Sequence, residues 1–274
     1  MLRKLMKYEL RATARIMLPL YLAVLGLAAV LWLLSLWSGA VSHIHLTIFD
    51  PVSMIVTIVS IVFAISLAAV PIAAVVLMIV RFKTNLLSDE GYVMFTLPVS
   101  PHQLVWSKLL TSAVWFIGAA VVDGLGILFV SASENFFINL WSGFRDLFSQ
   151  LTAYYAVNGA LFLAELSVLI LLACFSECLE FYCPMAIGHS FARHKVLLSV
   201  VFYFVIQAAT QAATVILITA GLPFMGGLDI SGLGIHPVTL FHGALWAGIL
   251  ITVVYGGVLY ALTIRMLRRH LNLE

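Results

Sequence analysis

Six long runs of apolar residues follow one another along the chain, separated by connections that hold most of the charged positions. A helix of about 20 apolar residues is long enough to cross the roughly 30 Å hydrocarbon core of a bilayer. Every run reaches that length, so the pattern predicts six transmembrane helices. The second run is long enough to be tilted, and a bend is expected at Pro71. The predicted spans are residues 16–37, 51–80, 109–130, 152–175, 196–222 and 238–264.

Composition agrees with this pattern. The chain is 63% hydrophobic and only 9% charged, whereas soluble domains carry about 25% charged residues. We therefore expect an all-α membrane protein with a single transmembrane domain over residues 16–274, surrounded by membrane lipid. A net charge of +2 gives no reason to expect nucleic acid as a partner. The spans leave no room for a separate soluble catalytic domain.

Residues 1–15 form a basic segment ahead of the first apolar run. Cations on one face of such a segment reach anionic headgroups when the helix lies in the membrane interface, so we predict an amphipathic interfacial helix here. The apolar run that follows exceeds the roughly 7–15 residues of a signal peptide core, which favours an uncleaved first span. The cations that share the helical face are Arg3, Lys4, Lys7, Arg11 and Arg15.

The distribution of Lys and Arg predicts the orientation. Of the 14 such residues, only Arg145 falls in a connection of the opposite side. By the positive-inside rule, both termini and the segment 81–108 are cytoplasmic. The glycine-rich connection 223–237 is compatible with a re-entrant turn or with a plain surface loop. The outer connection 131–150 holds an aromatic run expected at the interface: Phe136, Phe137, Trp141, Phe144 and Phe148.

The cytoplasmic segment 81–108 contains two helix-start signals twelve residues apart. Ser88 is the predicted N-cap of the first helix, and the two carboxylates after it complement the helix dipole. Pro98 ends that helix, and Ser100 with Pro101 begins the next. The pattern predicts a short lateral helix that leads directly into the third span. Its apolar exposed face suits either contact with lipid headgroups or docking of a soluble partner.

Two carboxylates fall inside predicted spans, Asp123 in the third and Glu165 in the fourth. A carboxylate at membrane depth is costly, so it usually faces protein or water and often marks function. One interpretation is that these residues are protonated or hydrogen-bonded packing residues. The other is that one of them lines a transport path or couples protons.

Polar residues also recur at helical spacing in two spans. Such a stripe indicates either hydrogen bonds between helices or the wall of a polar cavity, and the sequence does not separate these. The second span carries Ser53, Thr57 and Ser60, and the fifth carries Gln207, Thr210, Gln211 and Thr214.

Enzyme and metal motifs are not found in the sequence. It contains no H-E-x-x-H, no G-x-S-x-G and no Walker-A phosphate loop. Three cysteines and two histidines near the end of the fourth span match no structural zinc spacing, and we expect reduced thiols that pack. We therefore predict a non-enzymatic chain with no metal and no cofactor of its own, whose energy source is a separate chain such as an ATPase. The five residues are Cys174, Cys178, Cys183, His189 and His194.

The segment SDEGYVMFTLPVSPHQLVWSKLL, residues 88–110, resembles the "DEGY…TLPVS…L..SK" signature of ABC-2-type transporter permeases, six-span membrane subunits of bacterial ABC exporters. The basic start MLRKLMKYELRATAR is similar to the N-terminal elbow helix of that family. The resemblance is strong over residues 81–110 and extends in outline over the whole chain.

The resemblance implies a permease subunit of an ATP-driven exporter in the bacterial cytoplasmic membrane. It implies two further partners, a separate ATPase in two copies, carrying ATP and Mg, and a second permease subunit in a homo- or heterodimer. An amphipathic substrate is expected, such as an antimicrobial peptide, a drug or a lipid-like molecule. By position, the two polar stripes would line the pathway, and the coupling helix that docks on the ATPase would include Asp89, Glu90, Gly91, Tyr92 and Phe95.

Two alternatives belong to other functional classes. A proton-driven secondary transporter would use Asp123 and Glu165, and it would need no ATPase. A non-transporting immunity or sensor protein would bind a ligand without turnover.

Overall fold

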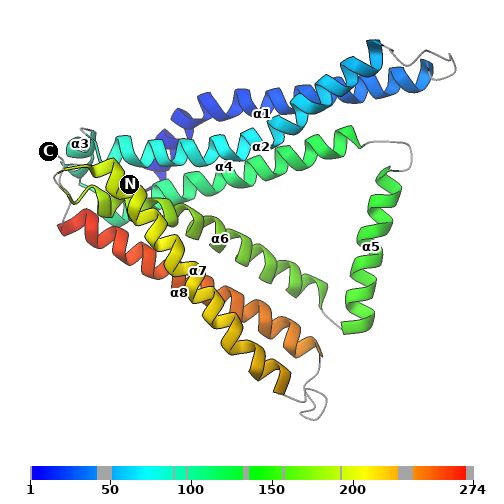
Figure 1. The fold of residues 1–274 in the computed structure, drawn as a ribbon. Coiled ribbons are helices and arrows are strands. Elements are labelled where there is room, and N and C mark those ends of the chain that lie inside the picture. The colour runs from blue at the N-terminus through cyan, green and yellow to red at the C-terminus, as the bar shows by residue number, and fades with distance from the viewer. Residues whose placement is uncertain are drawn as a thin grey trace. The chain divides into compact units, whose positions relative to one another are not determined.

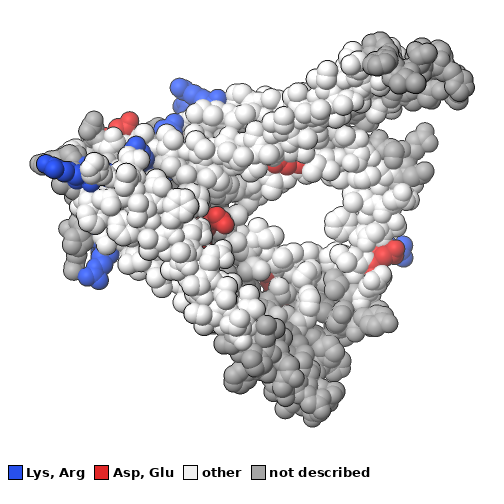
Figure 2. All heavy atoms as spheres, viewed as in Figure 1, with Lys and Arg blue, Asp and Glu red and all other residues white. Residues whose placement is uncertain are grey.

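The computed structural model describes residues 2–41, 51–88, 90–96, 98–131, 136–155, 158–191, 193–227 and 237–269. Within these ranges the chain forms eight α-helices and no β-strand (Figure 1). Six of the described helices are long and apolar enough to cross a membrane, as the hydropathy pattern predicted. Uncharged side chains make up most of the visible surface (Figure 2). The helices are α1 (Leu2–Val41), α2 (Pro51–Leu86), α3 (Glu90–Thr96), α4 (Pro101–Val130), α5 (Phe136–Tyr155), α6 (Gly159–Gly188), α7 (Lys195–Gly227) and α8 (Pro237–Arg269).

The helices divide into two compact units. The N-terminal unit comprises Leu2–Met78 and Leu110–Asp146, and the C-terminal unit comprises Ile79–Leu109 and Leu147–Glu274. Each unit has its own internal packing.

In the N-terminal unit, one stripe of α1 packs against α2 and α4. The stripe has alternating spacings of four and three residues, which keeps it on one helix face. From the other helices, Phe63, Val70 and Ala74 of α2 and Ala119 of α4 complete the buried cluster. The α1 residues are Met17, Tyr21, Val24, Ala28 and Leu31.

Polar contacts fix the register of α1 against α4 in the same unit. The Tyr21 hydroxyl donates to the Trp115 carbonyl at 2.6 Å, and the Trp115 indole donates to the Thr13 hydroxyl at 2.7 Å. A Cβ at Gly118 would lie 3.1 Å from the Tyr21 hydroxyl oxygen. The glycine therefore leaves the space that the tyrosine ring occupies.

In the C-terminal unit, α6 packs against both α7 and α8. Phe82 of α2 and Tyr182 of α6 stack with ring centroids 4.0 Å apart, and both side chains are fully buried. Near the end of α6, a Cβ at Gly188 would overlap the Ser199 backbone of α7. This close approach requires glycine at that position.

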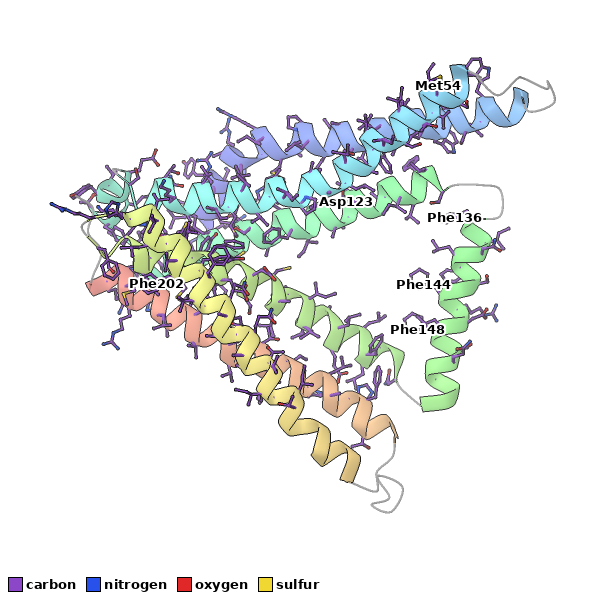
Figure 3. All side chains as sticks on the ribbon, viewed as in Figure 1. Met54, Asp123, Phe136, Phe144, Phe148 and Phe202 are labelled. Carbon is purple, nitrogen blue, oxygen red and sulfur yellow. The ribbon has the colours of Figure 1, made fainter. Side chains whose placement is uncertain are left out.

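The connection between the third and fourth spans is a helix, which the sequence did not predict. The 20-residue helix α5 includes the aromatic run, and Phe136, Phe144 and Phe148 lie along it (Figure 3). Trp141 and Phe144 are exposed. Spacings of four, three and four residues between Phe137 and Phe148 are helical, so the signal was present. The interfacial position expected for these aromatics stays a prediction.

Two predicted boundaries of the fourth span were wrong. Thr152 belongs to α5, and the next helix begins at Gly159, where the Asn158 side chain caps it by accepting from Ala160 N at 3.1 Å. At the other end, α6 continues through Pro184 to Gly188 instead of stopping at 175. The residues of this last part are mostly buried, so tertiary packing supports a helix that local sequence signals did not favour.

The basic segment 1–15 and the first span form one continuous helix, α1. All five of its cations are exposed, which fits the predicted cationic face. Whether this segment lies in the headgroup layer as an elbow stays a prediction. Within the glycine-rich connection, 223–227 belong to α7, and 228–236 lie outside the described residues.

Candidate functional site

The short helix α3 lies between α2 and α4, where the sequence predicted a lateral helix. Its first turn is closed by a hydrogen bond from Gly91 N to the Ser88 carbonyl at 2.7 Å. The next helix starts at Pro101, and Gln103 N contacts the Ser100 hydroxyl at 3.4 Å. The predicted N-cap at Ser100 and first helical position at Pro101 are therefore confirmed.

A chain of three polar side chains anchors α3 to its neighbours. Lys108 of α4 donates to the Asn85 side-chain oxygen at 2.5 Å, and the Asn85 amide donates to a Glu90 carboxylate oxygen at 2.5 Å. Lys108 and Asn85 are only 5% and 6% exposed. Hydrogen bonds that involve charged groups are roughly twice as strong as neutral ones. The start of α3 is thus tied to the last turn of α2 and to the second turn of α4.

The residues predicted to dock on a partner have different environments. Glu90 is exposed, but its carboxylate binds Asn85, and Gly91 is buried. Tyr92 is 52% exposed, and its neighbour Val93 is 64% exposed. Phe95 is half-buried. Asp89 lies outside the described residues. The surface that α3 presents is therefore formed mainly by Tyr92 and Val93.

Glu165 has a hydrogen-bond partner that the sequence did not indicate. His242 Nδ1 of α8 lies 2.6 Å from Glu165 Oε2 of α6, and Glu165 is 4% exposed. The other carboxylate oxygen, Oε1, is buried and has no hydrogen-bond partner among the described residues. Asp123 of α4 belongs to the other unit (Figure 3), and its Oδ1 is likewise buried without a partner in the described part of the chain. Within the described part of the chain, both carboxylates therefore have an oxygen available to accept a hydrogen bond.

The polar stripe of α7 divides into two halves. Gln207 donates to Glu180 Oε2 of α6 at 2.6 Å, and Tyr255 of α8 donates to Glu180 Oε1 at 2.7 Å. The Thr210 hydroxyl lies 3.2 Å from that of Tyr255. These contacts join three helices through one carboxylate. The other half of the stripe, Gln211 and Thr214, is exposed.

In the stripe of α2, the described side-chain hydrogen bonds of Thr57 and Ser60 stay within the helix. Ser53, Thr57 and Ser60 are all exposed. The hydroxyls of Thr57 and Ser60 donate to carbonyls four residues earlier in the same helix, at 2.8 Å each. Such bonds satisfy a hydroxyl on an apolar helix face. Their role in a pathway stays a prediction.

Sequence reasoning missed Asn85, His242 and Tyr255 as members of polar contacts, and it predicted ion pairs of Glu180 with Arg193 or Lys195 where the structure shows hydrogen bonds from Gln207 and Tyr255. Each is paired with residues far away in the chain or was assigned to a loop. Among the described residues, no group of three or more His, Cys, Asp or Glu could hold a metal ion. Cys178 and Cys183 form no disulfide in the described part of the chain, and both are buried in α6.

The fold and these contacts define a class, an all-α multi-pass membrane protein with a short helix fixed between its second and third candidate spans. Comparison of the chain with family models, curated proteins and solved structures found no match. Its function is therefore inferred from its own residues.

Proposed function

We propose that this chain is the transmembrane permease subunit of an ATP-driven ABC exporter, and that α3 is the element that docks on its ATPase. The observation that supports this most directly is the anchoring of α3. A helix that transmits force from a partner to a span must not move independently of that span. The Lys108–Asn85–Glu90 chain links α3 to α2 and α4, both candidate spans.

The exposed face of α3 supports the same proposal. Tyr92 and Val93 project apolar area from a helix of seven residues. Aromatic anchors of this kind often dominate the binding energy of protein interfaces. Gly91 is buried, so it lies on the face of α3 that packs on the rest of its unit.

The remaining parts of the proposal concern partners outside this chain. Two ATPase subunits would bind ATP and Mg, and a second permease, identical or different, would complete the transport path for an amphipathic substrate in the bacterial cytoplasmic membrane. Both termini and α3 would be cytoplasmic. The exposed polar residues of α2 and α7 would face this path.

The test uses the tagged full chain purified from native membranes in mild detergent. Tyr92→Ala should weaken co-purification of an ATPase about 30-fold, because losing an interface anchor costs about 2 kcal/mol. Tyr8→Ala is the matched control, since Tyr8 is exposed on α1 in the other unit. Glu90→Lys is less informative, because it also breaks the α3 anchor. Equal ATPase recovery with both tyrosine variants would contradict the docking assignment.

A second candidate, a proton-driven transporter, is favoured by the buried Glu165–His242 pair, in which Glu165 Oε1 has no hydrogen-bond partner among the described residues. It predicts transport that depends on a pH gradient and a chain that purifies without an ATPase. Glu165→Gln, and separately Asp123→Asn, would then abolish proton-coupled uptake. Unchanged transport between pH 5.5 and 8 in both variants would exclude this candidate.

A further inference from the structure

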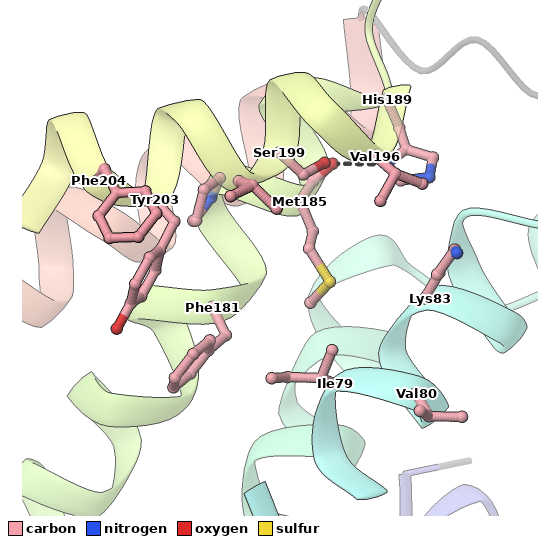
Figure 4. Close-up of a pocket in the computed structure, with 12 residues that line it drawn as sticks. Ile79, Val80, Lys83, Phe181, Met185, His189, Val196, Ser199, Tyr203 and Phe204 are labelled. Atoms are coloured by element: carbon pink, nitrogen blue, oxygen red, sulfur yellow. Dashed lines mark hydrogen bonds between the residues drawn. The ribbon is translucent and has the colours of Figure 1, made fainter. Parts of the chain in front are cut away.

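A pocket of about 460 Å³ lies in the C-terminal unit where the end of α2, the end of α6 and the start of α7 meet (Figure 4). This volume falls within the roughly 300–1,000 Å³ typical of ligand sites. The lining is almost entirely apolar. Phe181 and Met185 of α6 and Ile79 of α2 form part of the wall.

The pocket opens to the side of the helices. Val80 of α2 is 47% exposed, and Val196, Val200 and Phe204 of α7 are between 50% and 64% exposed, although all four line the pocket. α2 and α7 are both candidate membrane spans. A pocket whose rim is apolar and exposed on such helices is accessible to the acyl chain of a neighbouring lipid.

One lysine lines the pocket, and a second is next to the lining in the chain. Lys83 is the lining lysine, and Lys195, the first residue of α7, directly precedes the lining residue Val196. His189, also in the lining, is 4% exposed, and its Nδ1 lies 2.9 Å from the Met185 carbonyl oxygen (Figure 4). Burial lowers the pKa of the His189 imidazole, and the charges of Lys83 and Lys195 lower it further. The N-terminus of α7, which begins at Lys195, adds a dipole that favours an anion.

We propose that this pocket binds one anionic phospholipid of the surrounding bilayer, with an acyl chain against the apolar lining and the phosphate held by Lys83 and Lys195. The charges select an anionic headgroup, as basic pockets between transmembrane helices do. The apolar volume selects a ligand with a hydrocarbon chain over a small soluble anion. This inference does not depend on the exporter proposal, because it requires neither an ATPase nor transport.

The test is native mass spectrometry of the delipidated full chain, titrated with dioleoyl phosphatidylglycerol, dioleoyl phosphatidylcholine or glycerol 3-phosphate. We expect phosphatidylglycerol to bind more tightly than phosphatidylcholine, and glycerol 3-phosphate not to compete. Lys83→Gln and Lys195→Gln should each weaken phosphatidylglycerol binding about fivefold, and together about 25-fold. Arg145→Gln, which removes an exposed cation of the other unit, is the charge control and should change binding less than twofold.

A second pair of variants tests the acyl chain. Val200→Trp places a larger side chain in the pocket and should weaken phosphatidylglycerol binding at least tenfold. Val201→Trp, on an exposed neighbour outside the lining, should leave it unchanged. The proposal is overturned if Arg145→Gln weakens binding as much as the substitutions of Lys83 and Lys195, if glycerol 3-phosphate competes as well as the lipid, or if Val200→Trp binds like Val201→Trp.

Discussion

Lys108→Met removes the buried cation from which the α3 anchor starts. The variant keeps most of the side-chain length but leaves the Asn85 oxygen without the ammonium that donates to it at 2.5 Å. A hydrogen bond to a charged group contributes about 1.5–3 kcal/mol. Taking about 2 kcal/mol, α3 should detach from its neighbours about 30-fold more often.

Amide hydrogen exchange of the detergent-solubilised chain measures this detachment. Peptides that cover residues 90–96 should exchange about 30-fold faster in Lys108→Met, whereas peptides from α1 should be unaffected. Lys4→Met, which removes an exposed lysine, should leave α3 exchange as it is. Lys108 has further contacts, so the Asn85→Leu variant and the double variant are needed to isolate the shared hydrogen bond.

The double-mutant cycle of Lys108→Met and Asn85→Leu tests whether the two residues depend on each other. If the two residues act through one hydrogen-bonded chain, the double variant should lose clearly less than the sum of the single losses. Fully additive effects would mean that Lys108 and Asn85 stabilise the unit independently. Unchanged exchange of residues 90–96 in every variant would mean that α3 is held by apolar packing alone, and the support from anchoring for the proposed coupling would be lost.

Three further variants test the packing of the C-terminal unit through unfolding in detergent. Gly188→Ala should destabilise it by about 3 kcal/mol or more, because the new Cβ would lie 2.5 Å from the Ser199 backbone nitrogen, whereas Gly257→Ala meets open space and should be neutral. Tyr255→Phe removes one donor from a carboxylate that joins α6, α7 and α8, and should cost about 1–3 kcal/mol. His189 has a pKa below its usual 6.5, so the unfolded chain binds a proton that the folded chain does not, and stability should fall as pH falls through 6.5. His189→Asn should flatten this dependence.

The sequence was sufficient for the six apolar helices and for the start of α4. Hydropathy and capping are local properties of the sequence. Apolar runs of about 20 residues therefore predict membrane spans, and the Ser100–Pro101 pair predicts a helix start, without knowledge of the tertiary structure. Helix ends were less predictable. The last part of α6 contains Pro184 and two glutamates, yet it stays helical because it is buried between other elements.

The polar partners could not be predicted for a different reason. Lys108 and Asn85 are 23 residues apart, and Glu165 and His242 are 77 apart. Nothing in the spacing of either pair suggests contact, because their geometry arises only when the helices pack. The N-cap signal correctly located the start of α4, but it gave no indication that the lysine two turns later holds α3.

Glu165 and Glu180, the two glutamates of α6 that contact α8, have the same side chain but different hydrogen bonding. Each oxygen of Glu180 accepts a hydrogen bond, one from Gln207 and one from Tyr255. Glu165 has one oxygen bonded to His242 and one buried oxygen without a partner among the described residues. A buried oxygen without a hydrogen bond lowers the stability of the fold by about 1–3 kcal/mol. Glu180 avoids this cost because both of its oxygens accept hydrogen bonds. A hydrogen-bond donor supplied by a ligand would remove this cost at Glu165. Of these two carboxylates, Glu165 is therefore the one that has, among the described residues, an oxygen available for a further hydrogen bond.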